Sequence, residues 1–223
     1  DGTFRPANTL TGYAFMKMLL GALGYDAEVE QYTGANWSIN VAKRALNIGL
    51  DDDLVGEFNG VKAVNREEAC LYALNTLTAD MVEYDAKTTV STNGTTVVIA
   101  GSKAKEMVNN GNTDGKVFDK DGVMQFAEKY FDNLSVKTGS DDFARPANVW
   151  KLKAEEIGTY TNTPDATYTK KVENGDIYKD LGLGSKIEAK DVSVYEDGVK
   201  KTNTVAIEKG DDTKVGNSGN GVL

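Results

Sequence analysis

The sequence predicts an α+β protein with a helical N-terminal part, a hairpin and a mixed, β-rich C-terminal part. Three observations predict this class. Two amphipathic helical segments repeat within residues 1–79, an Asn-Gly pair stands between two β-branched runs, and short Thr- and Val-rich segments follow Val136. We therefore expect a helical module at residues 1–79, a β-hairpin connector at 80–105 and a C-terminal α+β surface domain at 106–223.

The helical module contains an internal repeat. Residues 1–24, DGTFRPANTLTGYAFMKMLLGALG, align without a gap onto residues 55–78, VGEFNGVKAVNREEACLYALNTLT, so that Leu10 falls on Val64. A repeat of this length is typical of stacked helical units, none of which buries its apolar face alone. The repeat therefore favours assembly and surface binding over catalysis.

Each copy leads into a helix, and a shorter helix lies between them. Thr11 and Asn65 are suited to cap the two helix N-termini, and Gly24 and Gly49 are suited to end helices. The side chains expected to face the core recur at helical spacing. They are Phe15, Met18, Leu19, Ala22 and Leu23, then Val41, Ala42, Ala45 and Leu46, then Ala69, Tyr72, Ala73, Thr76 and Leu77.

Downstream of residue 79 the pattern changes to strands and turns. Asn93-Gly94 between two β-branched runs predicts a tight hairpin, and Asp197-Gly198 predicts a further turn. Residues 122–134, GVMQFAEKYFDNL, predict an amphipathic helix. Its expected apolar face consists of Val123, Phe126, Ala127, Tyr130, Phe131 and Leu134.

Composition narrows the range of functions. The chain has 34 acidic and 25 basic residues and a formal net charge of −9, so it offers no basic stripe for nucleic acid. No apolar run reaches the roughly 18 residues of a membrane span.

Histidine is absent, which excludes Ser-His-Asp and Cys-His catalysis and an ordinary zinc site. We expect no enzyme activity and no cofactor, and the single Cys70 is expected to be inert packing.

A run of oxygen-bearing side chains before the predicted 122–134 helix resembles a calcium loop. It consists of Asn110, Asn112, Asp114, Asp119 and Asp121, with Gly115 and Val117 between them. We nevertheless take a solvated loop without metal as the default, because a chain rich in Asp, Asn and Gly produces such matches by chance.

Three motifs of the helical module are similar to those of one known family. They are Trp37 within NWSINVAKRALNIGL, the turn DGTFRP, and the helix start Val64-Asn65-Arg66-Glu67-Glu68. Over residues 1–79 the chain resembles the S-layer homology (SLH) module of Gram-positive, Firmicutes-like bacteria. The resemblance implies an extracellular protein, part of a larger S-layer or secreted protein, that is held noncovalently on a secondary cell-wall polysaccharide. That polymer commonly carries a negatively charged pyruvyl ketal sugar.

The resemblance implies a polysaccharide-binding set of Trp37, Asn65 and Arg66. Arg66 would add a charged donor to the amides at a helix N-terminus, and Trp37 would offer a flat face to a sugar ring. The first copy has Gly12 where the motif has Arg, and the second has Gly60 where the family often has Pro. At most one groove is therefore expected to bind.

Alternatives remain for these residues and for the whole chain. Arg66 could form an ordinary surface ion pair, and Trp37 could be a packing residue of the core. The chain could also be a structural lattice block with degenerate repeats that self-associates in a surface layer. A third alternative is an accessory part of a surface glycoside hydrolase.

Overall fold

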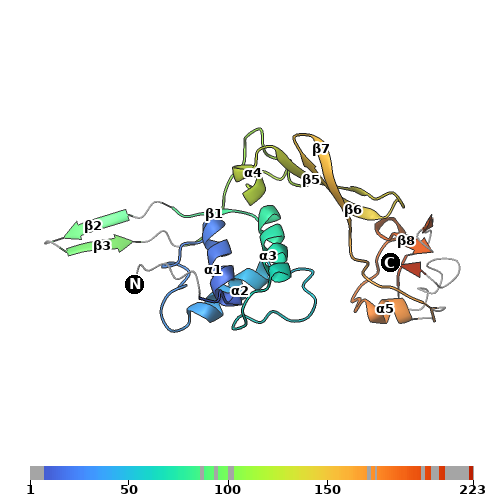
Figure 1. Ribbon diagram of the computed structural model, residues 1–223, viewed down its shortest axis with the longest axis horizontal. Helices are drawn as coiled ribbons and strands as arrows, with labels where there is room; N and C mark the ends of the chain where they lie inside the picture. Colours follow the sequence, from blue (N-terminus) through green and yellow to red (C-terminus); the bar gives the residue numbers. More distant parts are fainter. Residues whose placement is uncertain are drawn as a thin grey trace. The chain divides into compact units, whose positions relative to one another are not determined.

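The computed structural model describes residues 8–85, 88–92, 95–99, 103–169, 172–173, 175–196, 199–201, 206–208 and 221–222. By its internal contacts the chain divides into two compact units, Asp1–Ser135 and Val136–Leu223. The predicted segment boundaries near residues 79 and 105 both lie inside the first unit. Helices and small antiparallel sheets occur together, which confirms the α+β class (Figure 1).

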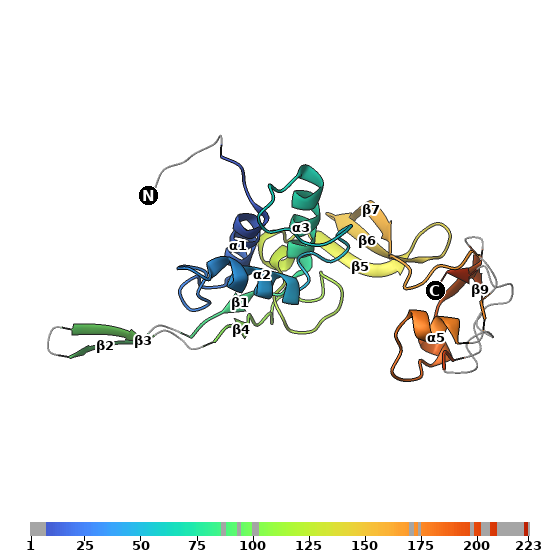
Figure 2. The ribbon, with the colours of Figure 1, turned by 90° about the horizontal axis from the view of Figure 1, so that it is seen from below.

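The first unit is built around α1 (Gly12–Ala22), α2 (Trp37–Asn47) and α3 (Arg66–Thr78), which lie together in both views (Figures 1 and 2). Both predicted N-caps are confirmed. The Thr11 hydroxyl accepts the Ala14 amide at 3.4 Å, and Asn65 forms a reciprocal capping box with Glu68. These caps satisfy amides that the helix itself leaves without a partner.

The glycines after α1 and α2 end these helices, as the sequence predicts. Gly24 and Gly49 have φ values of +103° and +72°, a backbone region that glycine adopts without strain. At Gly24 a side chain is also excluded by space, because a Cβ atom would lie 2.2 Å from the Val82 carbonyl oxygen. The end of α1 is therefore packed directly against the strand that follows α3.

The predicted core faces are partly wrong. Val41, Ala45, Tyr72, Thr76 and Leu23 are buried as expected, whereas Met18, Ala22, Leu46 and Ala73 are exposed. In α1 the buried side chains are Met16 and Leu20. Apolar residues surround nearly the whole circumference of α1, so their spacing does not select one face. The choice is made by the neighbours, because α1 packs against both α2 and α3.

The two sequence copies share one core but bury different faces. The positions of α3 that correspond to Met16 and Leu20 are Cys70 and Leu74, and both are exposed. The expectation that Cys70 is a packing residue is therefore wrong. All three helices nevertheless contribute to a single hydrophobic cluster. The two copies thus share the position of the helix start and contribute to one core. Equivalent positions of α1 and α3, however, do not face that core in the same way.

The segment before α3 pairs with the segment before α1. Thr11 bridges Ala63 in antiparallel fashion, and the amides of Gly12 and Tyr13 donate to the carbonyls of Lys62 and Gly60 at 3.0 and 2.9 Å. In the reverse direction the Val64 amide donates to the Leu10 carbonyl at 2.9 Å. The two copies are therefore joined by backbone hydrogen bonds at the starts of their helices.

Gly12 is fully buried by this pairing. A Cβ atom at Gly12 would lie 2.9 Å from the carbonyl oxygen of Asn59 and 3.0 Å from the Cα of Gly60. A Cβ at Gly60 would in turn lie 2.2 Å from the Tyr13 ring. The two glycines that differ from the SLH-like motifs therefore both lie at close contacts, with backbone atoms at Gly12 and with the Tyr13 ring at Gly60.

Short strands extend the first unit beyond α3. β1 (Val82–Glu83) pairs with β4 (Lys105–Glu106), and the backbones of Met81, Met107 and Met124 are joined by hydrogen bonds of 2.8 Å. Between β1 and β4, the strands β2 (Thr88–Thr92) and β3 (Thr95–Ile99) form an antiparallel pair, which confirms the predicted hairpin. Its Asn93-Gly94 turn lies outside the described residues.

The helix predicted at 122–134 is present but much shorter than expected. Only α4 (Phe126–Tyr130) is helical, Val123 bridges Val108, and β5 (Leu134–Ser140) begins at the last residue of the predicted helix. The apolar residues of this segment do recur at helical spacing. The helix is short because the backbone before and after α4 forms hydrogen bonds with other segments instead. Tyr130 and Phe131 are consequently exposed.

The second unit contains two small sheets and a short helix. The end of β5, β6 (Pro146–Leu152) and β7 (Glu155–Thr161) form one sheet, with Val136, Ala147 and Trp150 buried. The other sheet has the order β10 (Gly221–Val222), β8 (Val194–Glu196), β9 (Val199–Lys201). Near it lie α5 (Asp176–Asp180) and the 3₁₀ helix η1 (Ala189–Asp191), and Ile177, Val194 and Ile207 form a small core. The predicted Asp197-Gly198 turn lies outside the described residues.

Gly12→Ala tests the pairing of the two copies. We expect the variant to lose about 1–3 kcal/mol of unfolding free energy, because the added methyl group meets backbone atoms that cannot rotate away. Gly21→Ala in the same helix is the matched control, since no atom lies within 4 Å of its Cβ position. It is expected to gain about 0.5–1 kcal/mol from helix propensity. Urea unfolding measures the unfolding free energy of both variants. The same change in both would contradict the close contact at Gly12.

Candidate functional site

The N-terminus of α3 is the candidate site that the sequence predicts. Arg66 is the first residue of the helix and is exposed, and its guanidinium has no ion pair or hydrogen bond with any described residue. The amides of Asn65 and Glu68 are used by the capping box. The amides of Arg66 and Glu67, in contrast, make no hydrogen bond within the described part of the chain. Charged and backbone donors are thus available side by side.

Asn65 has a different part in this site from Arg66. Its side-chain oxygen accepts the Glu68 amide at 2.8 Å, and the Glu68 carboxylate accepts the Asn65 amide at 2.9 Å. The Asn65 amide and the Lys62 ammonium, 3.2 Å away, both lower the pKa of Glu68. Asn65 therefore orients the helix start, and the negative charge of Glu68 is already compensated.

Trp37 is half-buried at the first position of α2. The Tyr13 ring packs edge-on against it with centroids 6.3 Å apart, and the Lys17 ammonium lies over its ring at 5.3 Å. Lys17 is held there by a 2.6 Å hydrogen bond to the Tyr32 carbonyl. These contacts favour the packing interpretation of Trp37 over that of an open platform for sugar.

A row of aromatic rings connects Trp37 with α3. Tyr13 contacts Phe58 at 5.9 Å, and Phe58 contacts Tyr72 of α3 at 6.1 Å between ring centroids. The cation over the Trp37 ring is that of Lys17 and not that of Arg66. The predicted set is therefore split into a helix start that carries Asn65 and Arg66 and an aromatic row that fixes α2 against α3.

The corresponding helix start in the first copy is closed. The amides of Gly12 and Tyr13, which would face a ligand, donate to the carbonyls of Lys62 and Gly60. The burial of Gly12 leaves no room for an Arg side chain at this position. Of the two helix starts, the one at α3 keeps its arginine and its accessible surface.

The predicted calcium-loop residues are engaged with the protein or exposed. Asp114 accepts the Gly122 amide at 3.2 Å, and Asp121 accepts the Val123 amide at 2.8 Å. Asn110, Asn112 and Asp119 are exposed. Within the residues that the structure describes, no three His, Cys, Asp or Glu side chains lie close enough together to hold a metal ion.

The buried carboxylate of Glu128 accepts hydrogen bonds that hold this loop in place. The sequence pattern did not indicate this role. Glu128 of α4 is 1% exposed, and one of its oxygens accepts the amides of Lys116 and Val117, each at 3.0 Å. Its other oxygen accepts the side-chain amide of the fully buried Asn109 at 2.7 Å. These donors compensate for the loss of water around a buried charge.

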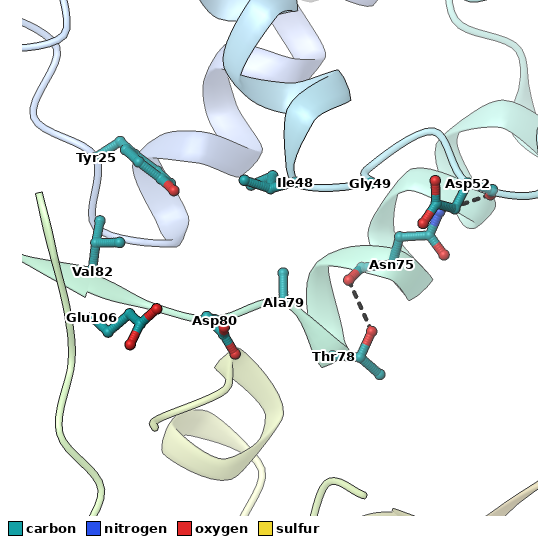
Figure 3. A pocket seen from close by; sticks show the side chains of 10 residues that line it. All are labelled: Tyr25, Ile48, Gly49, Asp52, Asn75, Thr78, Ala79, Asp80, Val82 and Glu106. Atoms are coloured by element: carbon teal, nitrogen blue, oxygen red, sulfur yellow. Dashed lines mark hydrogen bonds between the residues drawn. The ribbon is translucent and has the colours of Figure 1, made fainter. Parts of the chain in front are cut away.

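A cavity of about 410 Å³ lies beyond the C-terminal ends of α1, α2 and α3 (Figure 3). Asp52, Asp80 and Glu106 line it, and the figure shows Asp52 beside Asn75, apart from the other two carboxylates. Helix C-termini and carboxylates are both negative, so this cavity disfavours an anionic ligand.

The second unit has a cavity of about 500 Å³ between its strands and its small core. Arg145 lines it but is neutralised by Asp141, which accepts the Arg145 Nε at 2.7 Å, the Arg145 amide at 2.9 Å and the Thr161 hydroxyl at 3.0 Å. Partial desolvation raises the pKa of Asp141, but these hydrogen bonds outweigh it and hold the pKa at about 2. Arg145 is therefore held by Asp141 and stabilises the loop that joins these two residues.

Comparisons with protein-family models, with curated proteins and with solved structures gave no match. Among the helices in the described ranges, none has the length and apolar character needed to cross a membrane.

Asp141→Asn tests the hydrogen-bonded loop of the second unit through its dependence on pH. A carboxylate with a lowered pKa stabilises the folded state fully above its ordinary value of 3.8 and loses this effect as the pH falls towards about 2. Wild type should therefore be more stable than Asp141→Asn at neutral pH, and the difference should shrink through this window.

Urea unfolding followed by Trp150 fluorescence, in a Trp37→Phe background, measures this difference in the second unit. Trp150 is the remaining tryptophan, since the chain has 2, and it is 7% exposed in the folded state. A difference that stays constant across the window would contradict the lowered pKa of Asp141.

Proposed function

We propose that the chain is a non-catalytic part of a larger cell-surface protein and attaches it noncovalently to an anionic secondary cell-wall polysaccharide. The SLH-like motifs suggest this class of function. The observation that carries it is Arg66 at the start of α3, which is exposed and has no ion pair within the described part of the chain. Its place of action would be the cell wall or surface layer of a bacterium.

The chemistry of this helix start suits an acidic sugar. The helix dipole places partial positive charge at the N-terminus, and the amides of Arg66 and Glu67 are available to an oxygen ligand. The guanidinium can add two parallel hydrogen bonds to a carboxylate such as that of a pyruvyl ketal. A pre-formed capping box keeps these donors in place before the ligand arrives.

One such contact gives modest affinity, which is compatible with anchoring. A wall polysaccharide repeats its charged unit, and a larger protein with several modules would engage several units at once. The closed helix start of the first copy contributes to the framework, and that of the second copy contributes the binding surface. This division agrees with the loss of the motif arginine at Gly12.

A structural lattice block is the second candidate, and exposed apolar side chains of the second unit favour it. Leu152, Ile157 and Tyr160 of β6 and β7 are 44%, 56% and 61% exposed, and Phe143 is 63% exposed. Such side chains suit contacts with another protein surface or another copy. Concentration-dependent light scattering without polysaccharide would favour this function.

Arg66→Gln tests the anchoring proposal in a pull-down of the chain on purified cell-wall sacculi. We expect wild type to be retained, and retention to disappear when the polysaccharide is removed. Arg66→Gln should weaken binding about tenfold, the loss expected for one charge-assisted hydrogen bond. Glu67→Gln should strengthen binding, because it removes a neighbouring negative charge.

The matched control is Lys120→Gln, which removes an exposed positive charge far along the chain from α3. It should leave retention unchanged if the contact is local. Equal weakening by Arg66→Gln and Lys120→Gln, or retention on sacculi stripped of polysaccharide, would contradict the proposed site.

A further inference from the structure

The cavity beyond the C-terminal ends of α1, α2 and α3 combines space with unused hydrogen-bonding groups (Figure 3). Its volume of about 410 Å³ falls within the range of roughly 300–1,000 Å³ that small-molecule sites occupy. Its apolar lining consists of Tyr25, Ile48, Ala79 and Val82, and its carboxylates are those of Asp52, Asp80 and Glu106. It can therefore hold a ligand that has both an apolar body and a charge.

The hydroxyl group of Tyr25 indicates a missing partner in this cavity. Tyr25 is 8% exposed, and its hydroxyl makes no hydrogen bond with a described residue. Figure 3 shows the hydroxyl pointing into the cavity. Among the described residues, the polar atoms that lack both a partner and solvent belong to Tyr32 and Gln125, so the Tyr25 hydroxyl stays within reach of a ligand. Buried polar groups ordinarily have a partner, which this hydroxyl lacks.

Two of the three carboxylates lie on one side of the cavity. Val82 pairs with Glu106 across β1 and β4, and Asp80 lies two residues before Val82, so these positions share one face. Burial raises the pKa of Tyr25, and the nearby charge of Asp80 adds to the rise. Asp80 accepts the Gln125 side-chain amide at 2.9 Å, whereas the Glu106 carboxylate has no ion pair or hydrogen bond with a described residue. Negative charge is thus left uncompensated beside the Tyr25 hydroxyl.

The helix ends add acceptors, and the donors of the lining are already used. The carbonyls of Ile48, after α2, and Thr78, at the end of α3, accept no hydrogen bond within the described part of the chain. The Asn75 side-chain amide donates to the carbonyls of Leu50 and Asp52 at 3.2 and 2.9 Å. The Thr78 hydroxyl donates to the Asn75 carbonyl at 3.1 Å. A ligand of this cavity must therefore supply the donors itself.

We propose that this cavity binds an alkylguanidinium group, with its charge between the Tyr25 hydroxyl and the carboxylates of Asp80 and Glu106. The alkyl stem would lie on Ile48 and Ala79. A guanidinium has five donors and no acceptor, which matches a lining rich in acceptors. It forms paired hydrogen bonds with carboxylates and is more weakly hydrated than an ammonium, which suits acceptors placed among apolar side chains. The site lies at the opposite end of α3 from Arg66 and does not depend on the anchoring function.

Titration of the whole chain with butylguanidinium at constant ionic strength, followed by NMR, tests this inference. We expect the backbone amide signals of Gly49 and Ala79, which line the cavity, to shift. Butylammonium should bind about fivefold more weakly because it offers fewer donors, and uncharged butanol should not bind measurably. Tyr25→Phe should weaken butylguanidinium binding about fivefold, the loss expected for one hydrogen bond. It should leave stability unchanged, because the hydroxyl has no partner in the protein.

Glu106→Gln and Glu83→Gln form a matched pair on the same two strands. Glu83 is exposed, adjoins Val82 in β1 and is not part of the cavity lining. Glu106→Gln should weaken butylguanidinium binding about fivefold, as loss of an exposed charged partner implies. Glu83→Gln removes the same charge and should bind as wild type does. Arg66→Gln should also bind butylguanidinium normally while it loses retention on sacculi, which keeps the two sites distinct.

The guanidinium group occurs both in small molecules and in arginine side chains. Acetyl-arginine methylamide carries the group on a peptide backbone. Tighter binding of this compound than of butylguanidinium would assign the cavity to an arginine of a partner protein, and weaker binding would assign it to a free small molecule.

Three results would overturn the inference. One is the absence of any shift at Gly49 and Ala79 with butylguanidinium. Another is equal weakening by Glu106→Gln and Glu83→Gln, which would mean that only the overall charge matters. The third is binding of butylammonium as tight as that of butylguanidinium, because the cavity would then attract any small cation.

Discussion

The pairing of residues 58–64 with the start of α1 is the contact on which the first unit depends. It uses backbone hydrogen bonds in both directions, from Gly12 to Lys62 and from Val64 to Leu10, and it allows no side chain at Gly12. Because the donors at the start of α1 are consumed here, the two copies are fixed relative to each other. The common hydrophobic core of α1, α2 and α3 forms around this arrangement.

The same contact makes the two copies chemically unequal. The start of α1 is filled by the chain, whereas the start of α3 keeps an exposed arginine beside amides that bond to no described residue. Charge is also unequally distributed within the first unit. Carboxylates and helix C-termini surround one cavity, and cations and amides of α2 line another. By local charge alone, the start of α3 suits an acidic ligand better than the cavity beyond the helix C-termini does.

Local patterns in the sequence were sufficient to predict the helix starts, the glycines that end helices, and the hairpin. Thr11, Asn65 and Gly24 act through groups within a few residues, so their roles can be read from neighbouring positions. The core face of α1 and the length of α4 could not be predicted this way, because distant segments decide them. Glu128 shows the same limit, since its donors at Asn109, Lys116 and Val117 become neighbours only in the fold. The role of Trp37, Asn65 and Arg66 in binding polysaccharide stays a prediction, and the ring contact of Trp37 with Tyr13 becomes visible only in the fold.

Hydrogen exchange measured amide by amide, with and without the purified wall polysaccharide, tests both the pairing of the two copies and the proposed binding at α3. We expect the amides of Gly12, Tyr13 and Val64 to exchange slowly in the free protein, because each donates across the pairing of the two copies. The amides of Arg66 and Glu67 should exchange rapidly and become protected when the polysaccharide is added. Rapid exchange at Gly12 and Val64 would contradict the pairing, and protection by the polysaccharide that omits Arg66 and Glu67 would contradict the proposed binding.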